Sequence, residues 1–470
     1  MEKSSKPKRT SHFAAVANPK RSHSVMDRIV TPVSRASNSL WSSSRTSSSK
    51  KTPQDTYDVA IIGGGFSGLW SAYHLNKLDP SLKIAIFEAE VLGFGASGRN
   101  GGWASSEYPV YKETLKKRIG SARTAQLFEA LDGSINEIGV FSSNQKEVGF
   151  VKSGSLYFAR NKAQLERLKA KVDGSSYFLG ANEVKEKLKV EGVLGGVFNP
   201  ICATINPFNL LNSLASHLER VGVAIFEGSW ASPTHGGALV NSSFIAAPVV
   251  VQATEAFGSP GREFIPLYSL MVATEPLSDS IWNEIGNPER FTFAENSHMV
   301  NYAQRTTDNR IAIGGRGATY PFGSKLKTSK ESTAKVHETI RALLKSWFPV
   351  LRDVNFTHSW GGAVAVTRNW EPYVQWNPKE GFGRLGGYAG DGVTMSHLSA
   401  KILAHEILDK DSELRKLHFV NSRIRKWEPE PIRYLGVNAL VKLSGIADKE
   451  ERLTGRASLL NRVIEPLILR

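Results

Sequence analysis

Three glycines, Gly63, Gly65 and Gly68, follow the spacing G-x-G-x-x-G. The apolar run Tyr57–Ile62 before them predicts a buried strand, and apolar residues at three-residue spacing from Leu69 onward predict a helix after them. In this setting the first glycine permits a tight turn, the second lets the backbone approach a pyrophosphate, and the third lets helix and strand pack closely. Because the helix N-terminus also attracts phosphate, the predicted chemistry is dinucleotide binding.

An acidic residue, Glu88, lies twenty residues beyond Gly68, in a second predicted strand at Lys83–Glu90. A carboxylate at this position accepts hydrogen bonds from ribose hydroxyls, so it favours FAD or NAD over NADP. The spacing alone leaves FAD and NAD open.

Two further glycine-rich segments bear on that choice. The decapeptide GFGASGRNGG, Gly93–Gly102, is half glycine and carries one cation, Arg99, and one amide, Asn100. So much glycine disfavours a helix or strand interior, and we expect a ligand to lie against this backbone. A third cluster, Gly383–Val393, opens onto an apolar helix. An NAD-binding domain needs neither segment, which favours FAD.

The elements that must position these loops alternate along the chain. Residues 121–141 and 330–348 are predicted helices, and Asn206-Pro207 is typical of a helix start. Predicted strands lie near 224–226, 248–252, 267–275, 300–305 and 310–314. Since several of them follow one another without a helix between, we expect an antiparallel sheet in a second domain.

Composition excludes several classes of protein. The chain has 470 residues, 41% hydrophobic and 22% charged, which is enough for a large two-domain enzyme. We expect no transmembrane segment, because no apolar run approaches the length of a membrane span. The single cysteine, Cys202, excludes a disulfide framework within the chain and favours a reducing, cytoplasmic location. The eleven histidines contain no H-E-x-x-H pattern, so we expect no metal.

The net charge of +15 is unevenly placed. Residues 1–56 contain eleven Lys and Arg against three Asp and Glu, a net charge of +8, so the remainder carries +7. This Ser-, Arg- and Pro-rich stretch predicts a disordered tail, with some likeness to an organelle transit peptide. We expect no specific nucleic-acid partner. One alternative stays open here, a non-catalytic protein that binds polyanions or membrane surfaces and retains a vestigial nucleotide site.

Four segments together resemble the D-amino-acid-oxidase-like (DAO) family of FAD-dependent oxidoreductases, and within it the bacterial flavoproteins related to γ-glutamylputrescine oxidase. They are DVAIIGGGFSGLWSAYHL, GFGASGRNGGW, WGGAVAVTRNWEP and GGYAGDGVTMSHLSAKILA. The resemblance extends over about 38–470, since Asn38–Trp41 is similar to the family's lead-in and Trp427–Val441 to its tail. It leaves an NAD-dependent dehydrogenase as the weaker enzyme alternative.

The resemblance implies an α/β (α+β) fold with a Rossmann-like FAD-binding domain built from discontinuous segments. That domain would comprise 57–150, 205–260 and 355–410. A substrate domain with a mostly antiparallel sheet would comprise 151–204 and 261–354, and 411–470 would form a C-terminal helical extension.

The resemblance also implies roles for individual residues. The ADP half of FAD would be bound by Gly63, Gly65, Phe66, Ser67, Gly68, Glu88, Ala231 and Thr254. The flavin and pyrophosphate would lie against Ser97, Arg99, Asn100, Gly101, Trp360, Gly361, Gly390, Gly392 and Val393. The positions at which some relatives attach flavin hold neither His nor Cys, so non-covalent FAD is expected.

The implied reaction oxidises the C–N bond of an amine or amino acid by hydride transfer to flavin, with oxygen or another acceptor restoring the flavin. Such a transfer requires orientation more than an acid or base, so no catalytic residue is assigned. The substrate-side candidates are Tyr302, Arg305 and Tyr388. Strand alternation places Tyr302 and Arg305 on opposite faces, so at most one of them faces the flavin. We interpret Asp391 as a turn residue and His397 as a structural histidine.

Overall fold

The computed structural model describes residues 39–41, 52–258 and 261–468. Most of the predicted N-terminal tail, residues 1–38 and 42–51, lies outside the described residues. Ser39 and Trp41, which belong to the segment resembling the family's lead-in, are buried. Contacts join the described residues into one unit, and the two-domain division therefore stays a prediction.

A six-stranded sheet carries the predicted nucleotide motif, in the order β18-β19-β12-β1-β2-β8. Five of its strands are parallel, and β18 pairs antiparallel with β19. Their bounds are β1 (Val59–Ile62), β2 (Ile84–Phe87), β8 (Ala224–Phe226), β12 (Val249–Gln252), β18 (Tyr373–Asn377) and β19 (Phe382–Gly386).

Both faces of this sheet are covered. Val59 and Ile61 of β1 pack into the core shared with helices, whereas Ala60 and Ile62 pack into the core shared with a small antiparallel sheet. This explains why the run is apolar at every position rather than at alternate ones. The helices are α1 (Phe66–Leu78), α3 (Ser121–Ser142), α6 (Pro207–Arg220) and α9 (Gly392–Ile407). The small sheet consists of β9 (Ala231–Thr234), β10 (Gly237–Val240) and β11 (Ser243–Ala246).

An eight-stranded sheet follows the order β17-β13-β16-β15-β14-β4-β6-β5. Every pairing is antiparallel except β14 with β4, so the predicted mostly antiparallel sheet is confirmed. Its strand β17 was predicted to fall in the FAD-binding segment 355–410, but it pairs with β13 along its length. The bounds are β4 (Ser155–Ala159), β5 (Tyr177–Gly180), β6 (Gly195–Asn199), β13 (Phe264–Thr274), β14 (Thr292–Glu295), β15 (Asn301–Arg305), β16 (Ile311–Arg316) and β17 (Phe356–Thr367).

The two faces of the eight-stranded sheet differ. Side chains such as Phe293, Ala303 and Ile313 form a core with residues of three helices, α5 (Ala181–Lys187), α7 (Asp279–Ile285) and α8 (Ala334–Trp347). On the opposite face, Met271, Ala312 and Trp360 pack against Trp41. The strands β3 (Trp103–Ser105) and β7 (Cys202–Thr204) form a separate two-stranded sheet.

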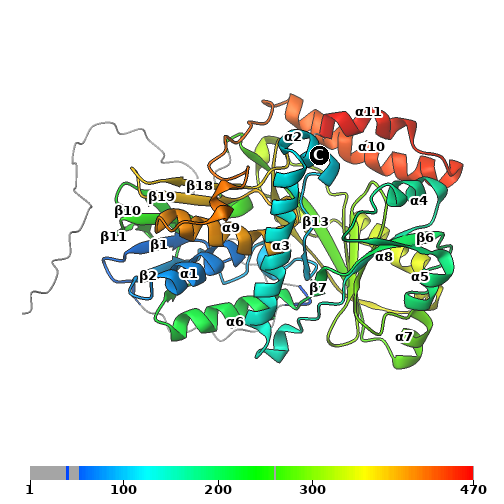
Figure 1. Ribbon diagram of the computed structural model, residues 1–470, viewed down its shortest axis with the longest axis horizontal. Coiled ribbons are helices and arrows are strands. Elements are labelled where there is room, and N and C mark those ends of the chain that lie inside the picture. Colours follow the sequence, from blue (N-terminus) through cyan, green and yellow to red (C-terminus); the bar gives the residue numbers. More distant parts are fainter. Residues whose placement is uncertain (1–38, 42–51, 259–260, 469–470) are drawn as a thin grey trace, which may run out of the picture. The chain divides into compact units, whose positions relative to one another are not determined.

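The remaining helices are α2 (Lys112–Ile119), α4 (Lys162–Lys169), α10 (Ile432–Thr454) and α11 (Leu459–Ile468). Helices α10 and α11, at the red end of the colour scale, lie side by side (Figure 1). Single 3₁₀ turns occur at Ala96–Gly98, Lys146–Val148, Glu255–Phe257, Phe322–Ser324, Thr328–Lys330, Pro349–Leu351 and Glu413–Lys416. None of the described helices combines the length and apolar character that a membrane span requires.

Candidate active site

The first glycine turn joins β1 to α1. Gly63 has φ +111°, and a Cβ built on it would lie 2.5 Å from the carbonyl oxygen of Ala253. A Cβ on Gly68 would overlap the carbonyl oxygen of Gly63. Strand and helix therefore approach to a distance that only glycine permits, as the sequence predicts.

The N-terminus of α1 begins at Phe66, with Gly65 as the N-cap residue and no acidic residue in its first turn. Since glycine has no side chain to cap the helix, the first N–H groups are available to other acceptors. One of them, the N–H of Phe66, donates to Ser97 Oγ at 2.9 Å. The second glycine-rich loop thus contacts the first at the positive end of α1.

Glu88 directly follows β2. Its carboxylate accepts hydrogen bonds from the N–H of Gly64 at 2.7 Å and of Glu90 at 3.0 Å. Burial raises the pKa of Glu88, and these two bonds oppose the rise. The backbone of Ser229 donates to the Glu88 carbonyl, which brings Ala231 to the same edge of the sheet.

Thr254 follows β12, and its amide nitrogen would lie 3.4 Å from a Cβ on Gly63. The residues predicted to bind the ADP half therefore meet at the carboxyl ends of β1, β2 and β12. In parallel sheets this edge is where nucleotides bind.

Arg99 fastens the second loop to β17. Its side chain is buried, with Nε donating to the Phe94 carbonyl at 2.8 Å and Nη1 to the Gly361 carbonyl at 3.3 Å. Trp360 Nε1 returns a bond to the Arg99 carbonyl at 2.8 Å. The predicted residues of the loop and of β17 are thereby brought together.

Asn100 shapes the loop from within. Its Nδ2 donates to the carbonyls of Ser97 and Ala96, and its Oδ1 accepts from the N–H of Gly102. Trp41 Nε1 donates to the Asn100 carbonyl at 2.8 Å. The indole of Trp41 meets that of Trp360 edge-on, with centroids 6.3 Å apart. The short segment 39–41 is thus a wall of the site, a role that the sequence did not reveal.

The glycine content of the decapeptide has a second cause. The sequence predicts glycine because a ligand approaches, but a Cβ on Gly98 would overlap the Gly93 carbonyl, and one on Gly101 would overlap the Tyr302 ring. The loop's own packing therefore requires glycine at these positions.

Helix α9 begins at Gly392, and Asp391 before it makes no side-chain capping bond. Its first N–H groups have no acceptor within the helix. Arg316, the last residue of β16, donates through Nη2 to the Ala389 carbonyl. A Cβ on Gly390 would lie 2.9 Å from the same Nη2. The predicted residues Gly390, Gly392 and Val393 thus adjoin the end of a strand of the eight-stranded sheet.

The face of that sheet which meets these loops is partly aromatic. The register pairs Tyr302 with Gly314 and Gly314 with Met271, so Tyr302 lies on the same face as Met271 and Trp360. Tyr302 Oη lies 2.6 Å from Ser269 Oγ.

Two further aromatic residues adjoin Tyr302, namely Tyr157 of β4 in the same sheet and Trp103 of β3 in the two-stranded sheet. The Trp103 ring lies edge-on to Tyr302 and to Tyr157, at centroid distances of 6.3 and 6.1 Å. Burial raises the pKa of both tyrosines, so their hydroxyls stay protonated at neutral pH. Trp103, Tyr157 and Tyr302 are hereafter the aromatic wall.

The structure separates the substrate-side candidates. Arg305 lies on the opposite face, with its guanidinium 4.2 Å from the centre of the Trp282 ring and Nη2 bonded to Asn309 Oδ1. Tyr388 is buried, and its hydroxyl lies 2.9 Å from Ser67 Oγ. Tyr302 lies against the decapeptide loop at Gly101, and Tyr388, in the third glycine cluster, lies against α1.

His397 and Cys202 also lie in surroundings that limit their chemistry. His397 packs between Trp70 and His74, and burial lowers its pKa to about 3. Burial raises the pKa of Cys202 to about 12, so its thiol is a poor nucleophile at neutral pH. Neither side chain is arranged for catalysis.

Sequence reasoning missed Glu255 altogether. Its carboxylate accepts bonds from the N–H groups of Ala365, Gly387 and Tyr388, which ties β17 to the loop before α9. Burial raises its pKa to about 7, despite these bonds. Because the donors are backbone groups, no side-chain motif marks the site. Arg316, Trp103 and Tyr157 were missed because only strand pairing shows which residues share a face.

A cluster outside these loops involves α10. Ligand-type atoms of His298, Asp448 and Glu451 lie within 4.8 Å of one another. Glu451 Oε1 accepts from Arg167 Nη1 at 2.5 Å, and His298 Nε2 lies 2.9 Å away. Both oxygens of Asp448 accept backbone N–H groups. We interpret this cluster as an ion-pair network that holds α10 to the chain.

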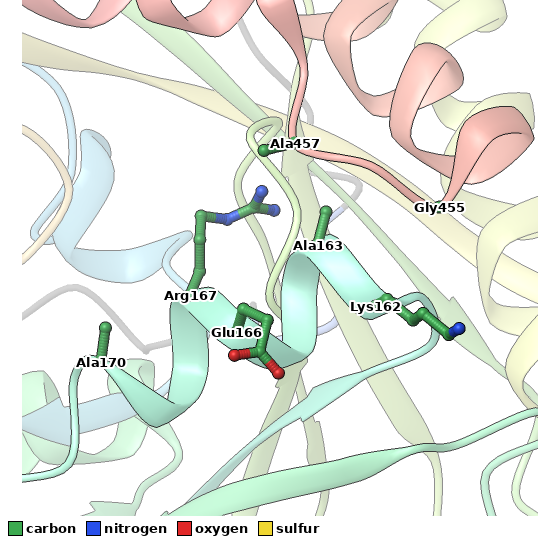
Figure 2. A pocket seen from close by; sticks show the side chains of 7 residues that line it. All are labelled: Lys162, Ala163, Glu166, Arg167, Ala170, Gly455 and Ala457. Atoms are coloured by element: carbon green, nitrogen blue, oxygen red, sulfur yellow. The ribbon is translucent and has the colours of Figure 1, made fainter.

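A hollow of about 370 Å³ lies beside this network, between α4 and the turn that joins α10 to α11. Figure 2 shows the side chains that line it. Its lining residues come from α4 and from 455–457, and none belongs to the glycine-rich loops. The hollow is therefore separate from the candidate active site.

Comparison with known families matches residues 58–406 to the model described as "FAD dependent oxidoreductase", DAO. Among curated proteins, the gamma-glutamylputrescine oxidoreductase of Escherichia coli is 26% identical over 398 residues, which cover 78% of this chain and 88% of that protein. A probable oxidoreductase OrdL of Haemophilus influenzae is 26% identical over 389 residues, covering 76% of this chain and 84% of its own.

Among solved structures, glycine oxidase from Geobacillus kaustophilus superposes with a TM-score of 0.65 at 18% identity, covering 79% of this chain and 99% of that one. L-proline dehydrogenase from P. horikoshii gives 0.64 at 18% identity, covering 77% and 95%. These likenesses confirm the predicted fold.

Proposed function

This chain belongs to the DAO family of FAD-dependent oxidoreductases, and on that premise we propose that it oxidises the C–N bond of an amine or amino acid. Membership in this family identifies the cofactor as FAD and not NAD. It also identifies the chain as an enzyme, so the alternative of a non-catalytic protein no longer applies. The substrate class is our proposal.

One observation carries the proposal. The decapeptide loop contacts the first glycine turn through Ser97, β17 through Arg99, and Tyr302 of the aromatic wall at Gly101. Arg316 connects the sheet that carries Tyr302 to the loop before α9. A cofactor lying along the loops would therefore have the aromatic wall beside its reactive end.

The residues fit FAD. Ser97 accepts the Phe66 N–H, and the other N–H groups at the N-terminus of α1 have no N-cap side chain, which suits a pyrophosphate. Glu88 offers a carboxylate at the position for a ribose. Bound FAD supplies the acceptor for a hydride from the carbon that bears nitrogen. The N-terminus of α9 is suited to stabilise negative charge near it, but the carboxylate of Asp391 at its N-cap position offsets part of this effect.

On the substrate side, the aromatic wall would exclude water and fix the orientation of the substrate. Tyrosine and tryptophan faces also attract an ammonium group. The names of the similar proteins include a gamma-glutamylputrescine oxidoreductase, a glycine oxidase and an L-proline dehydrogenase. Each of these names refers to a substrate with a C–N bond, but the substrates and acceptors differ. Experiments must therefore identify the substrate and the acceptor of this enzyme.

The test uses the purified protein. We expect it to be yellow and to release FAD into the supernatant on denaturation, since the attachment is proposed to be non-covalent. An anaerobic screen of amines and amino acids should then bleach the flavin absorbance with one class of substrate. Peroxide formed on readmission of air would identify an oxidase. The proposal would be contradicted if the protein binds FAD but no amine or amino acid bleaches the flavin absorbance.

A further inference from the structure

The outer face of α10 carries an apolar stripe. Leu435, Ala439, Lys442, Ile446, Lys449 and Leu453 are spaced alternately by four and three residues, so they share one side of the helix. Leu435, Ile446 and Leu453 are 63%, 49% and 87% exposed. The inner face is occupied by buried Arg433, Val437, Ala447 and Glu451, which hold the helix to the chain.

The stripe continues at both ends. Ile432, at the start of α10, is 61% exposed, and Leu459, at the start of the adjoining α11, is 65% exposed. Single exposed apolar side chains are ordinary, but a row of them along one helix face marks a site of interaction.

Cations lie both within the stripe, where they are Lys442 and Lys449, and C-terminal to it in sequence. Lys442, Lys449, Arg452, Arg456 and Arg462 are exposed, and within the described part of the chain none of them pairs with a carboxylate. The acidic residues Asp448 and Glu451 point inward and are bonded there. Glu450 bonds to Ser458 and to the N–H of Leu459. The outer face of α10 therefore alternates exposed apolar side chains with lysines, and further cations follow it in sequence.

We propose that this face, Ile432–Leu459, docks the enzyme on an anionic lipid bilayer. A helix of this kind lies in the plane of the membrane, with its leucines in the acyl boundary and its lysines extended to the headgroups. From Leu435 to Leu453 the stripe is about 27 Å long.

Charge favours a membrane over a second copy of the chain. Pairing two such stripes would place Lys442 and Lys449 in a helix seam, where a buried cation is costly. At an anionic surface the same lysines gain energy. The outer face of α10 is separate from the candidate active site, so membrane docking does not depend on which substrate the enzyme oxidises.

The test is sedimentation of the FAD-loaded enzyme with vesicles of phosphatidylcholine alone or mixed with phosphatidylglycerol. We expect binding to the anionic vesicles only, weakened by salt. Lys442→Gln with Lys449→Gln should lower the partition coefficient about fivefold per lysine. Leu435→Gln with Ile446→Gln and Leu453→Gln should abolish binding. Flavin content and turnover in solution should stay unchanged in both variants.

Val140→Gln is the matched control, because Val140 is 76% exposed on α3, away from this face. It should bind vesicles like the parent enzyme. Equal binding by parent and both stripe variants would overturn the proposal. So would a parent enzyme that ignores vesicles but is dimeric by light scattering and becomes monomeric when the three apolar residues are replaced, since the face would then join two copies.

Discussion

Arg99 is the side chain that connects the decapeptide loop to β17, through bonds to the carbonyls of Phe94 and Gly361. Replacing it with alanine removes both bonds and a buried cation beside the predicted flavin site. We expect Arg99→Ala to lose most of its FAD, measured as the ratio of flavin to protein absorbance. Arg99→Lys keeps the charge without the planar fork and should be intermediate. Full FAD content in Arg99→Ala would show that the loop does not hold the cofactor.

Glu255 predicts a pH dependence. Its pKa of about 7 in the folded chain exceeds its ordinary value of 4.5, because burial disfavours the carboxylate. Its protonation therefore favours the folded state, fully below pH 4.5, and this contribution is lost as the pH rises through 7. The change amounts to up to about 3 kcal/mol. Thermal unfolding from pH 5 to 8 should show a decline that Glu255→Gln lacks. An equal decline in both proteins would refute this role.

Among single residues, the sequence predicted the positions of those that belong to one contiguous motif. Gly63, Gly68 and Glu88 lie where their spacing places them, because strand, turn and helix are contiguous in the chain. Glu255 and Arg316 act through backbone partners far away in sequence, so no local pattern reveals them. The opposite placement of Tyr302 and Arg305 followed from alternation alone.

The close packing of α1 against the end of β1 can be tested by substitution. A methyl group on Gly68 would overlap the Gly63 carbonyl, so Gly68→Ala must move the helix from the strand. Such overpacking costs about 1–3 kcal/mol and should also lower FAD affinity. Gly133→Ala is the control, because Gly133 lies in α3 with open space at its Cβ position. It should gain roughly 0.5–1 kcal/mol in chemical denaturation. Similar stability of the two variants would contradict the packing argument.

Elements with strong local signals were predicted well. Asn206 caps α6 through Asn209, and Pro207 begins that helix. The prediction at β17 was less accurate, because its glycines resemble those of a flavin loop while its long pairing with β13 depends on distant residues. Cap residues act locally, whereas sheet membership is decided by partners that the sequence does not specify.

For the whole molecule, the sequence showed that residues 411–470 follow the last glycine cluster. It did not show which contacts attach this C-terminal segment to the rest of the chain. The C-terminal helices are held by a network in which Glu451, 1% exposed, bonds to Arg167 of α4 and lies beside His298. Burial alone would raise the pKa of Glu451, but these partners outweigh it and lower the pKa to about 2. The ionised carboxylate therefore stabilises the fold.

This arrangement makes a final prediction. Because the pKa of Glu451 is lowered from 4.5, its contribution is present above pH 4.5 and is lost as the pH falls toward 2. At neutral pH, Glu451→Gln should lower the free energy of unfolding by about 2–3 kcal/mol, since Arg167 can still reach water. Limited proteolysis should then cut near α10 first. Glu413→Gln, which breaks an exposed pair with Lys416, should change stability by less than about 0.5 kcal/mol. If Glu451→Gln is as stable as Glu413→Gln at neutral pH, the network does not hold the C-terminal helices.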